Sequence, residues 1–189
     1  MGDPKFSRKK YEKPTHPWQA DRIEEESELI KKYGLKNKRE IWKARSMLRN
    51  FRRQARVLFP KLRIEDKQAQ KEAKQLIMKL VNLGILSENA TLDDILALTI
   101  DALLSRRFQT IVYKKGLAST VKQARQLIVH GHLGIGNKKV TIPSYMVKKA
   151  EEAEISYIEG SPLANEMHPV RPKPQLESGV AIKGVSEDG

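Results

Sequence analysis

The sequence predicts an α+β protein. A basic helical N-terminal domain is expected first, then a small module of two helices and an antiparallel hairpin, with an extended arm before them and an extended tail after them. Apolar residues recur at helical spacing at 41–59, 69–80 and 121–128, and alternation around a Gly-Asn turn begins only after residue 131. The expected boundaries are 1–20 for the arm, 21–98 for the helical domain, 99–159 for the module and 160–189 for the tail.

Composition points to a polyanionic partner. The 189 residues include 36 Lys and Arg against 23 Asp and Glu, a formal net charge of +13. Residues 1–63 alone carry 19 basic and 8 acidic side chains, so the positive charge is concentrated in the first third. Nucleic acid, an anionic membrane surface and an acidic protein are the candidate partners. The chain has no cysteine, which excludes disulfides and cysteine zinc sites. With no secretory signal and no apolar run of membrane length, a cytoplasmic location is expected.

Helix signals are clear in the first half of the chain. One helix is expected from about Asp21 to Tyr33 with Gly34 as its stop, and its acidic run at 24–26 is interpreted as a solvated face. Asn37 is a suitable N-cap for the next helix, with Glu40 placed as in a capping box. Pro60 is expected to end that helix.

The second helix divides into an apolar face and a cationic face. The apolar sector holds Ile41, Ala44, Leu48, Phe51, Ala55, Leu58 and Phe59, and the opposite side holds Arg39, Lys43, Arg45, Arg49, Arg52, Arg53 and Arg56. Solvated helix faces usually mix charges of both signs, but no acid lies between Ile41 and Pro60. Phosphate binding is therefore favoured. The alternative is a helix lying on a membrane, with Phe51, Leu58 and Phe59 facing lipid.

The elements that follow are shorter. A helix is expected at Asp66–Leu83, followed by a helical turn capped by Thr91 with Asp94 at its third position. One helix is expected from Thr99 to about Tyr113, and another is capped by Ser119 or Thr120 and closed by Gly131. Short strands through Val140 and Ile142 around the Gly136-Asn137 turn are expected next, and then a strand near Glu154–Ile158. The helix after Thr120 turns Lys122, Gln123, Arg125 and Gln126 to solvent. Two cations and two amides near a helix N-terminus favour phosphate binding.

The run from Leu103 to Val147 contains four motifs in order. They are a basic pair at Arg106 and Arg107, a Gly-x-Ala-Ser-Thr link at 116–120, Ala124-Arg125 on the second helix and a Val-x-x-Pro-Ser-Tyr element at 140–145. Together they resemble the S-four RNA-binding domain, a module found on ribosomal proteins, pseudouridine synthases and some tRNA synthetases. The resemblance implies RNA binding through a helix-plus-hairpin fold.

Segments outside the module extend the resemblance over nearly the whole chain. GDPKFSRKKYEKPTHPW near the start, YGLKNKREIW at 33–42 and GSPLAN at 160–165 are similar to the archaeal and eukaryotic branch of the small-subunit ribosomal protein S-four family. This implies a structural constituent of the small subunit that is a primary binder of 16S-type rRNA in the 5′ domain and nucleates assembly of that domain. The resemblance also implies a position near the mRNA entry channel, where the family influences translational fidelity. Implied partners are rRNA, neighbouring small-subunit proteins and mRNA near that channel, with no catalytic residue, cofactor, metal, membrane or small-molecule substrate.

The candidate RNA contacts form two sets that could clamp the arms of an RNA junction. They are Lys43, Arg45, Arg49, Arg52, Arg53 and Arg56 on the long helix, and Arg106, Arg107, Lys114, Lys115, Thr120, Lys122, Gln123, Arg125, Gln126, His130, Lys138, Lys139 and Ser144 on the module.

Several alternatives remain open at the level of sequence. The chain could be an RNA-modifying enzyme that uses the module for targeting, although the remaining length offers no catalytic domain, or an assembly factor that leaves before translation. His130 and His132 could suggest a metal, but a polar turn is the favoured interpretation because no third ligand lies nearby. Tyr145 could stack on a base or pack in the hairpin, and packing is favoured. The Pro-rich tail is expected to become ordered only against RNA or a neighbouring protein.

Overall fold

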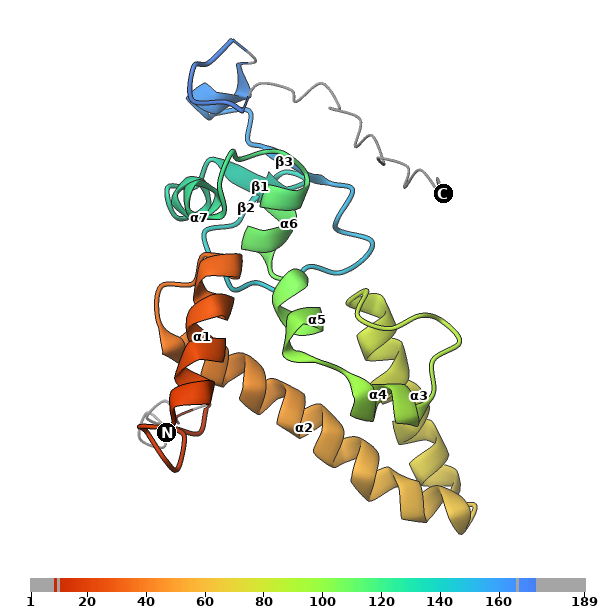
Figure 1. Ribbon diagram of the computed structural model, residues 1–189. Coiled ribbons are helices and arrows are strands. Elements are labelled where there is room, and N and C mark those ends of the chain that lie inside the picture. The colour runs from red at the N-terminus through yellow and green to blue at the C-terminus, as the bar shows by residue number, and fades with distance from the viewer. Residues whose placement is uncertain (1–8, 10, 166, 173–189) are drawn as a thin grey trace, which may run out of the picture.

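The computed structural model describes residues 9, 11–165 and 167–172, and its helices and three-stranded sheet confirm the α+β class. In chain order the elements are α1 Ala20–Tyr33, α2 Lys38–Arg63, α3 Lys67–Asn82, α4 Leu92–Ala97, α5 Ile100–Ser105, α6 Phe108–Lys114, α7 Val121–Val129, β1 Leu133–Ile135, β2 Lys138–Lys139, β3 Ile155–Tyr157 and the 3-10 turn Pro162–Ala164. The long helix α2 runs the length of the helical part (Figure 1). Helices α3 and α4 lie towards its C-terminal end, and α6, α7 and the sheet stand above its N-terminal end.

The apolar face of α2 forms the first core. Its buried side chains pack against α3 and α4 in a cluster made of Leu48, Phe51, Ala55, Leu58, Ala69, Ala73, Leu76, Leu80, Leu92, Ile95, Leu98 and Leu103. Burying each large apolar side chain contributes roughly 1.5–3 kcal/mol to the stability of the folded state. Phe51, Leu58 and Phe59 face this core instead of lipid, so the membrane-surface interpretation of α2 is wrong. No helix among the described residues is long and apolar enough to cross a membrane.

Pro60 does not end α2. The helix continues to Arg63 with Pro60 inside its last turn. A proline removes one backbone donor and crowds the preceding turn. Phe59 and Leu62 on either side of it pack against the first core, and this packing holds the last turn in place. The predicted end at Pro60 is therefore corrected by one turn.

The single helix expected from Thr99 is two helices, α5 and α6, with a break at Arg106 and Arg107. Arg107 is extended, with φ −69° and ψ 142°, and pairs as an antiparallel bridge with Met146. The first N–H groups of α6 then donate to the loop at 143–145: Phe108 to the Tyr145 carbonyl at 2.8 Å and Gln109 to the Pro143 carbonyl at 3.3 Å. Because a distant loop supplies these acceptors, the break costs few backbone hydrogen bonds.

The module has its own core beneath a small sheet. The sheet order is β2-β1-β3, antiparallel throughout, with Gly134 opposite Lys139 and Leu133 opposite Tyr157. The core comprises Phe108, Ile111, Val112, Ala118, Ala124, Leu127, Ile128, Leu133, Val147, Ile155 and Leu163. The expected strand through Val140 and Ile142 stops at Lys139. Beyond it the chain turns to deliver the 143–145 carbonyls to α6, and Ile142 is left exposed.

The start of the expected tail is part of the module. Leu163 is 5% exposed and packs in the second core, and the Ser161 hydroxyl lies 2.8 Å from Nδ1 of His132. The expectation of a tail that is ordered only by RNA or a protein is therefore wrong for these residues, because the Leu163 side chain is buried in the module's core. The rest of that expectation, from residue 173, and the first eight residues of the arm lie outside the described residues.

Helix α5 packs with the helical part although it was assigned to the module. Leu103 belongs to the first core, and Leu104 joins Tyr33, Leu35 and Ile41 in a third cluster between α1, α2 and α5. We propose a domain boundary near residue 106 in place of 98/99, because the module's own core begins at Phe108.

The N-cap of α7 gives a direct test of the fold. The Thr120 hydroxyl accepts the Gln123 N–H at 3.1 Å, whereas the described structure gives the Ser119 hydroxyl no such role. Thr120→Ala should lower the free energy of unfolding by about 1 kcal/mol. Urea denaturation measures this, and Ser119→Ala is the matched control, expected to change stability by less than about 0.5 kcal/mol. Equal effects of the two substitutions would contradict the assigned cap.

Candidate RNA-binding surface

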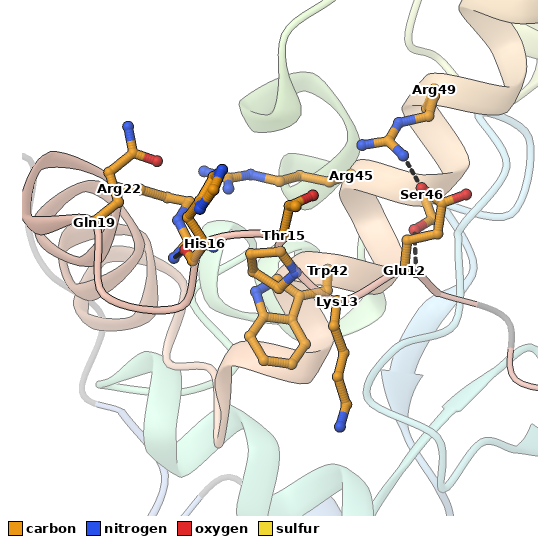
Figure 2. Close-up of a pocket in the computed structure, with 11 residues that line it drawn as sticks. Glu12, Lys13, Thr15, His16, Gln19, Arg22, Trp42, Arg45, Ser46 and Arg49 are labelled. Atoms are coloured by element: carbon orange, nitrogen blue, oxygen red, sulfur yellow. Dashed lines mark hydrogen bonds and ion pairs between the residues drawn. The ribbon is translucent and has the colours of Figure 1, made fainter.

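The N-terminal half of α2 is covered by the arm. Ser46 accepts a hydrogen bond from the Glu12 N–H at 3.2 Å, and the Glu12 carboxylate pairs with Arg49. The Tyr11 and Trp42 rings lie 6.1 Å apart. The cleft there is about 280 Å³ in volume and is lined by residues of the arm, α1 and α2, and Figure 2 shows Glu12 of the arm beside Ser46 and Arg49 of α2. The part of the arm that is described thus lies against the helix whose cations were predicted to bind RNA.

Glu26 is buried, contrary to its interpretation as part of a solvated face. Its side chain is 1% exposed and accepts hydrogen bonds at 3.1 Å from both Trp42 Nε1 and Arg45, with the Lys38 ammonium at 3.8 Å. Glu25, its exposed neighbour, pairs with Arg45 at 3.5 Å. A buried carboxylate needs such partners. The sequence does not show which glutamate of the 24–26 run is buried, because the burial of Glu26 follows from the packing of α1 against α2.

The remaining cations of α2 differ in their availability. Arg52 donates to the Leu98 carbonyl and is half-buried. Lys43, Arg53 and Arg56 are exposed and have no hydrogen bond or ion pair within the described residues. These three side chains can reach a phosphate without breaking an internal contact.

The basic pair of the module motif is engaged inside the protein. Arg106 pairs with Glu152 at 2.7 Å and donates to the Val147 carbonyl at 3.3 Å. Arg107 is 6% exposed and its guanidinium lies 2.6 Å from the Glu40 carboxylate. Their predicted contact with RNA remains a prediction, but these contacts give both residues a role within the fold.

Glu40 connects the helical part to the module. Its N–H donates to the Asn37 side chain as expected, but its carboxylate does not return to the N-cap. It binds Arg107 and also Arg125 of α7 at 2.7 Å, so the expected capping box is only half formed. Burial raises the pKa of Glu40, but the hydrogen bond from Arg125 and the charge of Arg107 outweigh it, and the net shift of the pKa is downward. The carboxylate is therefore charged at neutral pH.

The outer face of the module carries the other candidates. Exposed residues without a side-chain partner in the described part of the chain are Lys114, Lys122, Gln126, Lys138 and Lys139. Lys115 donates to the Ala153 carbonyl at 3.2 Å, Gln123 donates to the Val170 carbonyl at 3.1 Å, and Thr120 is the N-cap. This face combines free cations with residues that hold its backbone in place.

The structure places three side chains whose interpretation the sequence left open. The His130 and His132 rings stack with centroids 6.3 Å apart, and the described residues contain no cluster of three potential metal ligands. Tyr145 packs against the second core, and its hydroxyl donates to Glu151 at 2.9 Å, in agreement with the packing interpretation.

A cleft of about 370 Å³ lies between the two parts of the chain. It brings Lys43 of α2 together with Arg107, Arg125 and Ser144 of the module, residues that the sequence divided between two separate surfaces. Glu40, Met47 and Pro143 also line it and were not predicted as site residues. No local pattern marks them, since they meet only through the packing of the two parts.

The S4 domain family matches residues 106–153, the helix-plus-hairpin module. The chain is 57% identical over 171 residues to small ribosomal subunit protein uS4 of Picrophilus torridus, covering 90% of this chain and 93% of that protein. Proteins of the same name from Methanococcus aeolicus (54% identical, 90% and 96% covered) and Methanothermobacter thermautotrophicus (48% identical, 88% and 96% covered) also match. The chain belongs to the uS4 family of small ribosomal subunit proteins. The archaeal relatives confirm the predicted branch, and this membership agrees with the prediction of a non-enzymatic protein.

In this uS4-family chain the Glu40 cluster predicts a pH-dependent stability. Glu40→Gln leaves Arg107 buried without a carboxylate and should lower the free energy of unfolding at pH 7 by about 3–5 kcal/mol. The folded pKa of Glu40 is lowered, so its contribution is complete above the unfolded value of about 4.3 and is lost as pH falls through the folded value.

Urea denaturation of both proteins between pH 3 and pH 7 measures the effect. The difference between wild type and variant should shrink at the acidic end. Glu28→Gln, at an exposed residue of α1, is the control and should change little at any pH. A Glu40 effect that did not vary with pH would contradict a charge-based role.

Proposed function

We propose that this chain is a structural constituent of the small ribosomal subunit that binds small-subunit rRNA through two cationic surfaces. Membership of the uS4 family and the S4 domain match support the ribosomal role. The observation that carries the RNA-binding mechanism is the set of exposed cations with no internal partner among the described residues. Among the predicted contacts these are Lys43, Arg53 and Arg56 on α2, and Lys114, Lys122, Lys138 and Lys139 on the module.

The two surfaces differ in their chemistry. The α2 surface presents two arginines one helical turn apart, and arginine binds phosphate with two parallel N–H groups. The module surface presents lysines and the Gln126 amide. One of these lysines, Lys122, lies in the first turn of α7, where free N–H groups and the helix dipole favour an anion. Phosphate contacts of both kinds recognise the shape of folded RNA, not its sequence. The arrangement supports the proposal that the two surfaces clamp the arms of an RNA junction.

The finer assignment rests on the family resemblance. We infer that the rRNA target lies in the 5′ domain, that the protein binds it early in assembly, and that in the finished subunit it lies near the mRNA entry channel among other small-subunit proteins. The net charge of +13 supports rapid, salt-dependent association with rRNA. Cosedimentation with translating subunits separates this role from that of an assembly factor, which would leave before translation.

Charge reversal on α2 tests the first surface. Arg53→Glu combined with Arg56→Glu should weaken binding to 5′-domain rRNA at physiological salt by at least tenfold. The slope of log K against log salt should become shallower by about 1 for each phosphate that the variant no longer neutralises. Filter binding across a salt series measures both quantities.

The control carries the same change in charge elsewhere. Lys67→Glu combined with Lys71→Glu alters two exposed residues of α3 that belong to neither surface. This double variant should weaken binding much less. If both variants reduced affinity equally, net charge and not the α2 surface would govern binding.

A further inference from the structure

The cleft between α2, α5 and the 143–146 loop has an apolar wall. Met47 and Ala44 of α2, Leu103 and Leu104 of α5, and Pro143 and Met146 of the loop line it. Met47 is 41% exposed, although it lies beside buried residues of α2. An apolar wall next to a cationic rim is typical of sites for ligands that have one apolar part and one anionic part.

The rim of the cleft is positively charged. Lys43, Arg107 and Arg125 line it together with the single carboxylate of Glu40 and the Ser144 hydroxyl. Lys43 has no partner within the described structure, and Arg125 keeps a quarter of its side chain exposed while it binds Glu40. The balance of charge at the opening therefore favours a phosphate over a carboxylate-rich or cationic partner.

Arg107 provides a second, independent feature of the same cleft. Its side chain is 7% exposed, and its Nε is buried without a hydrogen-bond partner among the described residues. Unsatisfied buried donors are rare in folded proteins and call for an explanation. Arg107 is one of the residues that line the cleft, so an acceptor group of a ligand held there would lie close to this side chain.

We propose that this cleft takes one unstacked nucleotide of the bound RNA, with its base against the apolar wall and its phosphate at Lys43 and Arg125. This inference rests on the proposed RNA binding and adds a site for a base to surfaces that otherwise contact phosphates. The volume of about 370 Å³ lies in the usual range of small-ligand pockets, roughly 300–1,000 Å³. Splayed bases packed against side chains are a common element of RNA recognition by proteins.

Methionine methyl NMR tests the site directly, because two of the five methionines line the cleft. The protein carrying ¹³C-methyl methionine is titrated with 5′-domain rRNA and, separately, with inorganic polyphosphate. A base entering the cleft places its ring current on Met47 and Met146, so their methyl signals should move upfield with rRNA only. Met78 on exposed α3 lies outside the cleft and serves as an internal reference.

The outcomes separate the site from the proposed function. Saturable rRNA binding in filter assays without upfield shifts at Met47 and Met146 would overturn the nucleotide site and leave RNA binding intact. The same shifts with polyphosphate would also overturn it, because no base is then present. Absence of specific rRNA binding would overturn both proposals.

A cleft-filling variant gives an independent measurement. Ala44→Leu narrows the cleft without changing charge and should abolish the upfield shifts and weaken rRNA binding by roughly tenfold, as for removal of one packed base. Ala97→Leu makes the same substitution at an exposed residue of α4 and should leave affinity unchanged. Ser144→Leu, at an exposed position on the rim, repeats the test should Ala44→Leu unfold the protein. Unaltered affinity and shifts in folded variants would contradict the proposal.

Discussion

The pairing of Glu40 with Arg107 and Arg125 holds the two parts of the chain together. Each part has its own core, and this mostly buried carboxylate lies between them with guanidinium groups at 2.6 and 2.7 Å. Such a pair is not broken easily, because the charges left behind would be out of water. These pairs therefore resist a change in the angle between the cationic face of α2 and that of α7. Preorganisation of this kind reduces the entropy lost on association.

The cationic side chains of this protein fall into two groups, those paired with acidic side chains and those exposed to solvent. Arg45, Arg106 and Arg107 bind acidic side chains inside the fold, whereas Arg53 and Arg56 remain in solvent. Net charge alone does not distinguish these groups, so it overstates the number of phosphates that the protein can neutralise. Between the two parts of the chain, the ion pairs of Glu40 with Arg107 and Arg125 line the cleft described above. The exposed Lys43 thus lies in the same cleft as Arg107 and Arg125, which bind Glu40.

Much of the fold could be predicted from the sequence because its signals are local. The caps at Asn37 and Thr120, the left-handed Gly34 and the apolar stripe of α2 are set by neighbouring residues and helical geometry. Other local signals gave the wrong result, and three of them show the reason. Pro60 lies inside a helix, Glu26 is buried, and the chain breaks at Arg106 and Arg107. In each case contacts from a distant segment outweighed the local preference.

By itself the sequence determined the fold class, the position of most helices, the cationic character of α2 and the family of the protein. Helix periodicity, capping and family motifs act over a few residues or follow the chain in order, so they can be seen in one dimension. Only the tertiary structure decided which cations are free, that Glu40 joins the two parts, and that Lys43 and Arg125 border one cleft. The physical reason is that a charge is neutralised by whatever lies beside it in space. The partners Glu40 and Arg125 are separated by 85 positions in the chain.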